Sequence, residues 1–407
     1  MGIRNFIAIA LLLVISTSPL YIVKANVSNN SVPIECHTYY FVEIVKVSKG
    51  SYGNVTGLEL DVPTNVSLGN IVQVAKVVDY RGLIGRWIVD TSKPGISYIV
   101  TWVRICYPNS TWSVRLIRAL LMIPYLYSNY SEPTKMIRKY VGEPEPPILN
   151  VSQDFVVWLS KQGIPFARMS VAGLAYHAAL FVYWIYINYT PSAIPHSVEE
   201  TVKTRRGDCD DMSRVLTELL WHYRIPALMV YGYVVLNLTK PFTGTLGSFS
   251  FVMPNVGPHA FVVAYLQPFG WLSLDLLAGS FIAYPFIIVG VTNNTRVSER
   301  QVSEFVEFCL TTQGVNIAFA IPATLVDNVS KLLGESPTEV LKKVVNFVSS
   351  EISSGNVSIS QIFNFIKSLT KAYASEASKI AWISKRLGET SLGVKRWVMG
   401  SYIHLPR

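Results

Sequence analysis

The stretch TRRGDCDDMSRVLTELL, residues 204–220, places one of the chain's four cysteines where a helix is expected to begin. Cys209 follows a Gly-Asp pair and precedes two more acids. The first turn of a helix presents unpaired backbone N–H groups and a partial positive charge, and both stabilise a thiolate over a thiol. The apolar residues that follow recur at helical spacing, so one face of the helix should pack on a core. They are Met212, Val215, Leu216, Leu219 and Tyr223. Cys209 would remain at the exposed end, which makes it a candidate nucleophile.

Two more candidate residues lie on a predicted β-hairpin downstream. HAFVVAYL, residues 259–266, and GWLSLD, residues 270–275, read as strands joined by a short turn. The ends of such a hairpin lie side by side, so His259 at its start and Asp275 at its end can meet. The spacings are 259 − 209 = 50 and 275 − 259 = 16 residues. A histidine that takes a thiol proton and an aspartate that orients the imidazolium are the parts of an activated cysteine. The alternative is three unrelated residues.

These motifs resemble those of the transglutaminase-like superfamily, whose core is similar to that of papain-type cysteine proteases. The residues that carry the resemblance are 204–211, Ile225-Pro226-Ala227, Gly232-Tyr233, 259–262, Trp271 and Asp275. The resemblance runs from the apolar helix near residue 171 to just past Asp275. It implies an α+β, papain-like catalytic core, as in a secreted microbial member. It also implies that Cys209 is the nucleophile, His259 the base and later the acid, and Asp275 the orienting carboxylate. Leu276 stands where the family usually has proline, so the loop after Asp275 should differ.

The expected chemistry is acyl transfer through a thioester on Cys209. With water as acceptor the protein would be a peptidase or amidase acting on a protein or peptide, and this is the preferred interpretation. With a lysine amine as acceptor it would be a cross-linking transglutaminase. A non-catalytic surface binding module and an envelope factor acting on a cross-linked polymer are further alternatives. The backbone N–H of Cys209 and a side chain of the upstream helix are candidate oxyanion donors.

No cofactor, metal or nucleic-acid site is predicted. Asp208, Asp210 and Asp211 do not belong to a loop of alternating calcium ligands, and carboxylates at a helix start are explained by capping and the helix dipole. Cys209 has no cysteine partner nearby and the six histidines are dispersed, which argues against zinc. The net charge of +9 is spread along the chain without a basic run interleaved with aromatics.

Two features predict export. Residues 1–25 hold a positive start, a short apolar run and a small-residue cleavage site, as in a signal peptide, with an uncleaved anchor as the alternative. Twelve of the twenty asparagines lie in N-x-S/T, a pattern typical of surfaces that carry N-linked glycans. The sequons begin at Asn26, Asn29, Asn54, Asn65, Asn109, Asn129, Asn150, Asn188, Asn237, Asn293, Asn328 and Asn356. We therefore expect an exported protein that is either extracellular or associated with the cell surface.

The rest of the chain divides into predicted domains. Residues 26–130 hold short alternating runs broken by Gly, Pro and Asn, which predict a β-rich N-terminal domain. Residues 131–152 read as a linker, 153–297 as the catalytic domain and 298–407 as a helical C-terminal region.

Several local features leave alternatives open. Cys36 and Cys106 bracket the β-rich runs and could form a disulfide or remain as two buried thiols, while Cys309 reads as core filler. The apolar stretch 171–189 favours a buried core helix over a membrane span. Residues 239–257 look like an insertion that forms a lid or one wall of a cleft. The apolar stripe from Ile362 to Leu387 is a core or partner surface.

Overall fold

The computed structural model describes residues 32–55, 57–236, 240–279, 282–353 and 364. The described residues from 33 to 353 belong to one compact unit. The predicted signal peptide and the predicted stripe from Ile362 to Leu387 lie outside the described residues. Among the helices that are described, none combines the length and the apolar character needed to cross a membrane.

The larger of two main sheets has seven strands. In spatial order they are β11 (Phe242–Leu246), β12 (Phe249–Met253), β16 (Gln313–Pro322), β1 (Ile34–Lys49), β7 (Gly95–Pro108), β4 (Ile71–Arg81) and β3 (Val66–Leu68). All neighbours pair antiparallel except β12 and β16, which run parallel. The sheet takes strands from the segments predicted as N-terminal, catalytic and C-terminal domains. The domain boundaries themselves stay predictions.

The second main sheet has four strands and carries the predicted hairpin. Its order is β14 (Gly270–Ser273), β13 (Val256–Leu266), β10 (Ala227–Val235) and β15 (Phe286–Thr292). Two small sheets complete the strands: β2 (Gly57–Glu59), β6 (Ile88–Asp90) and β5 (Leu83–Ile84) form one, and β8 (Asn188–Tyr189) and β9 (Arg206–Gly207) the other. The short parallel pair of β8 and β9 leads directly into Cys209.

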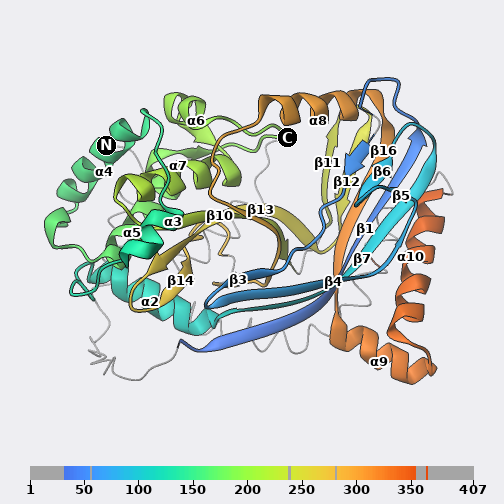
Figure 1. Ribbon diagram of the computed structural model, residues 1–407, viewed down its shortest axis with the longest axis horizontal. Helices are drawn as coiled ribbons and strands as arrows, with labels where there is room; N and C mark the ends of the chain where they lie inside the picture. The colour runs from blue at the N-terminus through green and yellow to red at the C-terminus, as the bar shows by residue number, and fades with distance from the viewer. Residues whose placement is uncertain (1–31, 56, 237–239, 280–281, 354–363, 365–407) are drawn as a thin grey trace. The chain divides into compact units, whose positions relative to one another are not determined.

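Helices cover the outer faces of both sheets (Figure 1). Around the four-stranded sheet lie α2 (Ser110–Met122), α3 (Thr134–Tyr140), α4 (Ile148–Lys161), the 3-10 helix η1 (Phe166–Arg168), α5 (Val171–Phe181), the π-helix η2 (Val182–Tyr186), α6 (Val198–Thr204) and α7 (Cys209–His222). Helices α9 (Ala323–Leu333) and α10 (Pro337–Ser353) pack on the seven-stranded sheet, and α8 (Glu299–Thr311) lies against β11 and β12.

Two apolar layers hold the catalytic segment in place. In one, Leu216 and Leu219 of α7 pack on Val262 and Leu272 of the four-stranded sheet. In the other, the opposite face of that sheet packs on the seven-stranded sheet, where Tyr233 meets Phe41 of β1. The four-stranded sheet is thus buried on both faces.

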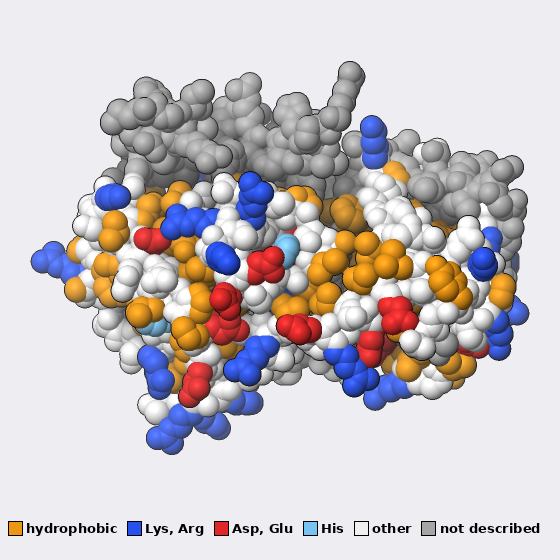
Figure 2. All heavy atoms as spheres, turned by 90° about the horizontal axis from the view of Figure 1, so that it is seen from above, with side chains coloured by type: hydrophobic (Ala, Val, Ile, Leu, Met, Phe, Trp, Pro, Cys, Tyr) orange, Lys and Arg blue, Asp and Glu red, His pale blue; other side chains and the backbone are white. Residues whose placement is uncertain are grey.

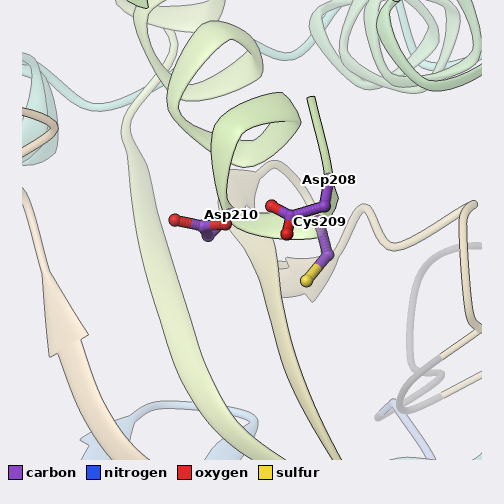
Figure 3. Close-up of side chains that lie close together, drawn as sticks. All are labelled: Asp208, Cys209 and Asp210. Carbon is purple, nitrogen blue, oxygen red and sulfur yellow. The ribbon is translucent and has the colours of Figure 1, made fainter. Parts of the chain in front are cut away.

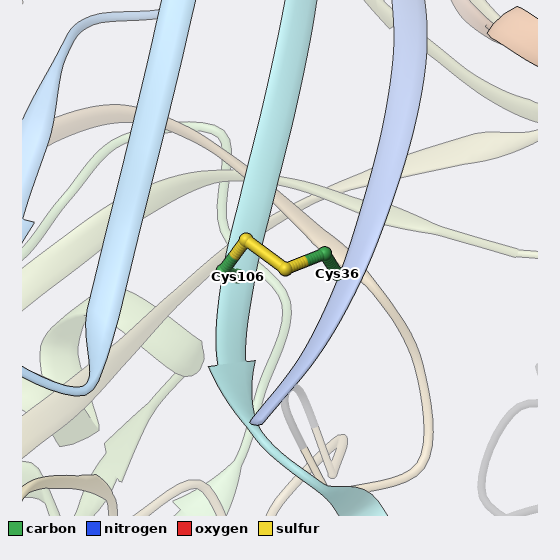
Figure 4. Close-up of a disulfide and its surroundings, with 2 residues drawn as sticks. All are labelled: Cys36 and Cys106. Atoms are coloured by element: carbon green, nitrogen blue, oxygen red, sulfur yellow. A yellow bond between two sulfur atoms is a disulfide. The ribbon is translucent and has the colours of Figure 1, made fainter.

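The disulfide alternative for Cys36 and Cys106 is the one observed. The two residues face each other on the neighbouring strands β1 and β7, and they form a disulfide (Figure 4). Cys309 is buried in α8, as the core-filler interpretation requires.

The α+β fold class is confirmed, but two local predictions need correction. The C-terminal region is not helical throughout, because residues 313–322 form β16 between β1 and β12. Within the predicted insertion, β11 and β12 form a hairpin that joins the edge of the seven-stranded sheet beside β16, so this hairpin is part of that sheet rather than a separate lid. The alternative that the insertion forms one wall of a cleft stays a prediction. The apolar segment that begins at Val171 is a buried helix, as predicted.

Candidate active site

Cys209 is the first residue of α7 and lies, with Asp210, at the half-buried N-terminal end of a helix whose middle is buried. Every residue from 211 to 221 is buried, whereas Cys209 is only half-buried. The sequence predicted a helix buried along one face, but its polar residues are buried as well: Glu218, for example, accepts the Thr295 hydroxyl at 2.6 Å. Gly207 allows the tight entry into the helix, because a Cβ there would lie 2.7 Å from the Cβ of Asp211.

His259 and Asp275 are brought together by the β13–β14 hairpin. His259 lies near the start of β13, and Asp275 comes two residues after β14 ends. His259 Nε2 is 2.8 Å from Asp275 Oδ2, and both side chains are buried. The backbone N–H groups of Leu277 and Ala278 donate to Asp275 Oδ1 at 3.1 Å each. The loop therefore holds the carboxylate from its other side, although Leu276 replaces the proline usual in the family.

Strand β10 constrains the position of His259, which lies on the neighbouring strand β13. Gly232 is the pairing partner of His259, and β10 has an irregularity in its pairing with β15 at this residue. A Cβ on Gly232 would lie 2.0 Å from the carbonyl oxygen of Ile287. Only glycine therefore lets β15 approach so closely behind the histidine.

The surroundings of His259 favour its imidazolium form. Burial alone would lower the pKa of His259, but the charge and hydrogen bond of Asp275, with the hydrogen bond and charge of Cys209, raise this pKa to about 10. Because Asp275 contacts Nε2, Nδ1 is the ring nitrogen left for the Cys209 thiol. The structure thus brings all three predicted residues together around one imidazole.

Asp208 and Asp210 lie close to Cys209 at the start of α7 (Figure 3). Protonation of Asp208 and the pairing of Asp210 with Arg214 reduce their negative charge. Burial, followed by the hydrogen bond with Asp210, raises the pKa of Asp208 to about 8, so Asp208 is mainly neutral at pH 7. Burial would also raise the pKa of Asp210, but the hydrogen bond from Asp208 and the pairing with Arg214 lower it. This arrangement limits the negative charge beside Cys209.

A second His–Asp pair adjoins the site and was missed in the sequence. His196 Nδ1 lies 2.8 Å from Asp211 Oδ2, and the backbone N–H of His196 donates to Asp211 Oδ1 at 2.7 Å. The hydrogen bond with Asp211 raises the pKa of His196. His196 stands in an irregular loop that contains two prolines, without periodicity or a motif, so nothing in the sequence connects it to the helix of Cys209.

The site offers a weak candidate set for a cation. One ligand atom each from Asp208, Cys209 and Asp210 lie within 4.8 Å of one another. Asp208, whose pKa is raised to about 8, is mainly neutral at pH 7, and Asp210 pairs with Arg214. The chemistry of this set favours carboxyl pairing over a metal, and the absence of a metal stays a prediction.

Arg205 supports the segment that leads into Cys209. Its guanidinium binds Asp154 Oδ2 at 2.8 Å and lies 4.5 Å from the centre of the Tyr186 ring. The backbone of Arg205 adopts a left-handed conformation with φ of 54°, which ends α6 and turns the chain into β9. These contacts hold Arg205 in the loop that precedes Cys209.

Comparison with known proteins yields one family and one structural similarity. The family model described as "Transglutaminase-like superfamily" matches residues 172–276, a span that includes Cys209, His259 and Asp275. No curated protein matches the chain. A solved structure described as "a Putative Cysteine Protease from Cytophaga hutchinsonii" is similar at 13% identity and a TM-score of 0.34, over 64% of this chain and 83% of that one. Residues 172–276 of the chain therefore form a domain of the transglutaminase-like superfamily.

Proposed function

We propose that the protein is an exported, cysteine-dependent acyl-transfer enzyme that hydrolyses peptide or amide bonds. The observation that carries this proposal is the His259 imidazole, which is hydrogen-bonded to Asp275 at 2.8 Å and lies close enough to Cys209 for the cysteine to raise its pKa. This is the arrangement by which a base activates a thiol while a carboxylate orients the base.

Acylation follows from the placement of the three groups. His259 Nδ1 holds the proton of Cys209, and the thiolate attacks the carbonyl carbon of the scissile amide to form a C–S bond. The backbone N–H of Cys209, at the start of α7, is the candidate donor to the oxyanion. When the tetrahedral intermediate collapses, the C–N bond breaks and the imidazolium returns its proton to the leaving amine. The acyl group is then a thioester on Cys209.

Deacylation uses the same imidazole in reverse. His259, now neutral, takes a proton from water as the water oxygen attacks the thioester carbonyl. Collapse of the second intermediate breaks the C–S bond, releases a carboxylic acid and restores the thiolate–imidazolium pair. Asp275 keeps Nδ1 directed at the sulfur through both steps, because it accepts the hydrogen bond of Nε2.

Alkylation tests the activated cysteine without knowledge of the substrate. Iodoacetamide at pH 6.5 should label Cys209 rapidly, and peptide mapping separates it from the buried Cys309, whose pKa is raised to about 11 by burial. His259→Ala should abolish the fast labelling. Glu304→Gln, which removes a carboxylate paired with Arg300 within α8, serves as the control. Slow labelling of the unchanged protein at pH 6.5 would contradict the proposal.

The acyl acceptor is tested with a glutamine-containing protein and a labelled primary amine. Hydrolysis is the preferred outcome, because transfer to an amine requires exclusion of water from the thioester. Peptide fragments or released ammonia without incorporated label support hydrolysis, whereas incorporated label supports the transglutaminase alternative. Asp275→Asn should lower the turnover number by on the order of 10⁴-fold, since it removes the charge that stabilises the imidazolium.

A non-catalytic surface binding module is the second candidate. It requires the fold but not the chemistry, and it would leave Cys209 no more reactive than an ordinary thiol. The buried His259–Asp275 pair beside Cys209 favours the enzyme, because a binding surface has no need of a buried ion pair at this position.

Export and glycosylation belong to the same proposal. The Cys36–Cys106 disulfide supports it, since structural disulfides persist mainly in oxidising compartments. The described sequon asparagines are exposed, apart from half-buried Asn109, whose side chain caps α2. Mass spectrometry of the protein from its native membrane and medium fractions tests both export and glycosylation.

On the face shown in Figure 2, Lys and Arg side chains are interspersed with Asp and Glu, which fits a protein or peptide partner better than a nucleic acid.

A further inference from the structure

Two buried hydroxyl groups connect the helix of the candidate nucleophile to the strand of the candidate base. Ser213, one turn after Cys209 on α7, has its Oγ 2.6 Å from the carbonyl oxygen of Cys209. The same Oγ lies 3.3 Å from the carbonyl oxygen of Ala260, the residue directly after His259. The hydroxyl of Tyr183 lies 3.3 Å from Ser213 Oγ. One side chain thus touches the backbone beside both reacting groups.

The donors and acceptors of this row follow from the protons available. The Ser213 hydroxyl donates to the Cys209 carbonyl at 2.6 Å and, at the longer distance of 3.3 Å, to the Ala260 carbonyl, so the Tyr183 hydroxyl is the donor to Ser213 Oγ. The backbone of β13 beyond Ala260 is in turn held by the segment after β14, because the Leu274 N–H donates to the Val262 carbonyl at 2.8 Å. Because Tyr183 and Ser213 are almost fully buried, no water is needed to complete the row.

The position of Tyr183 ties the row to the triad itself. Tyr183 belongs to the π-helix η2, an irregular turn of a kind often found at functional sites. Burial raises the pKa of Tyr183, and the nearby charges of Asp275 and Cys209 raise it further. The hydroxyl therefore stays protonated and acts only through hydrogen bonds. In a buried site such bonds are strong, and an unpaired partner is costly.

We propose that Ser213 and Tyr183 are positioning residues that set the distance and orientation of Cys209 relative to His259. This inference rests on the proposed function, because it concerns the same thiol and imidazole. Apolar packing between α7 and β13 permits sliding along the helix axis, whereas the Ser213 hydroxyl, shared between the carbonyl oxygens of Cys209 and Ala260, fixes the first turn of α7 against β13. Removal of either hydroxyl leaves the apolar contacts but lets the sulfur shift from the imidazole.

The test is the alkylation of Cys209 by iodoacetamide between pH 5 and 9, in the full chain. Tyr183→Phe and Ser213→Ala should each lower the rate at pH 6.5 by roughly ten- to a hundredfold. They should also move the pH profile toward that of an ordinary thiol. Because the two hydroxyls act in one row, the double variant should be little worse than either single variant. Tyr223→Phe is the matched control, since it removes a hydroxyl bonded to Ser152 Oγ at 2.8 Å in the same core.

The outcomes separate this inference from the proposed function. If His259→Ala slows labelling but Tyr183→Phe and Ser213→Ala behave like Tyr223→Phe, the positioning role is overturned and the activated thiol stands. If the unchanged protein labels slowly, both fall together. A general loss of stability would not explain the expected result. Tyr223→Phe also removes a core hydroxyl, and it should leave the pH profile of Cys209 alkylation unchanged. Circular dichroism of each variant confirms the folded state, and Ser213→Ala carries the test if Tyr183→Phe does not fold.

Discussion

Asp211 binds both the backbone N–H and the imidazole of His196, at 2.7 and 2.8 Å, and so pins an irregular loop to the first turn of the helix that begins with Cys209. Asp208 adds a second attachment to the same loop, because its Oδ2 accepts the backbone N–H of Ser192 at 3.2 Å. The loop around residues 192–196 is thus held by the acids that surround the candidate nucleophile. This gives those acids a role that capping alone does not explain.

The His196–Asp211 pair should make the stability of the protein depend on pH. The pKa of His196 is raised by Asp211, so its contribution is fully present below the ordinary histidine value of about 6.5 and is lost as the pH rises through the folded-state value. His196→Gln should therefore lower the melting temperature more at pH 6 than at pH 9. His222→Gln is the control, since His222 lies at the far end of α7. Equal losses at both pH values would contradict the expectation.

The carboxyl group of Asp208 should destabilise the folded protein as the pH rises. Its pKa is raised to about 8 in the folded protein, while an unfolded aspartate titrates near 3.9, so the unfolded state loses its proton first. The folded state is penalised increasingly from about pH 4 to about pH 8. Asp208→Asn keeps an acceptor for Ser192 and a donor for Asp210, and it removes this penalty. Denaturant unfolding should show a larger gain at pH 8.5 than at pH 4.5, and a gain that does not change with pH would refute the raised pKa of Asp208.

The fold and site were predictable where a local pattern dictates a local structure. The capping box of Ser336 and Glu339 is one case: the Ser336 N–H donates to Glu339 at 2.8 Å and the Glu339 N–H donates to Ser336 Oγ at 3.3 Å. The hairpin that joins His259 to Asp275 is another, because alternation and a short turn set both strands. Cys209 was found because its neighbours form a recognisable motif.

Long-range pairings account for what the sequence did not reveal. β16 was read as part of a helical region, because its strand character depends on a central place between β1 and β12. Tyr183 reaches Ser213 from the π-helix η2, and an apolar helical run does not predict such a turn. Ser213 is one polar residue in a buried helix, and its two carbonyl neighbours are defined only when α7 meets β13.

The Cys36–Cys106 disulfide should contribute substantially to stability. It joins the central strands β1 and β7 across a sequence separation of 70 residues, so it removes much conformational freedom from the unfolded chain. Replacement of both cysteines by serine should lower the free energy of unfolding by about 2–4 kcal/mol. Guanidinium unfolding of the oxidised protein and the double variant measures the difference. The same replacement should leave alkylation of Cys209 unchanged, since neither cysteine contacts the site, and a parallel loss of labelling would show that the strands also support the triad.

Gly232→Ala should disturb the candidate site from behind. The new methyl group would lie 2.0 Å from the Ile287 carbonyl oxygen, so β10 and β15 must separate at the residue that pairs with His259. We expect a loss of roughly 3 kcal/mol in the free energy of unfolding, together with slower alkylation of Cys209 at pH 6.5. Gly244→Ala is the matched control: it lies in the edge strand β11, and its Cβ would meet nothing within 4 Å. If both variants unfold at the same denaturant concentration, close approach of β15 is not what requires glycine at this position. If Gly232→Ala loses stability but Cys209 is alkylated at the normal rate, then the position of His259 depends on Asp275 and β14 rather than on β10.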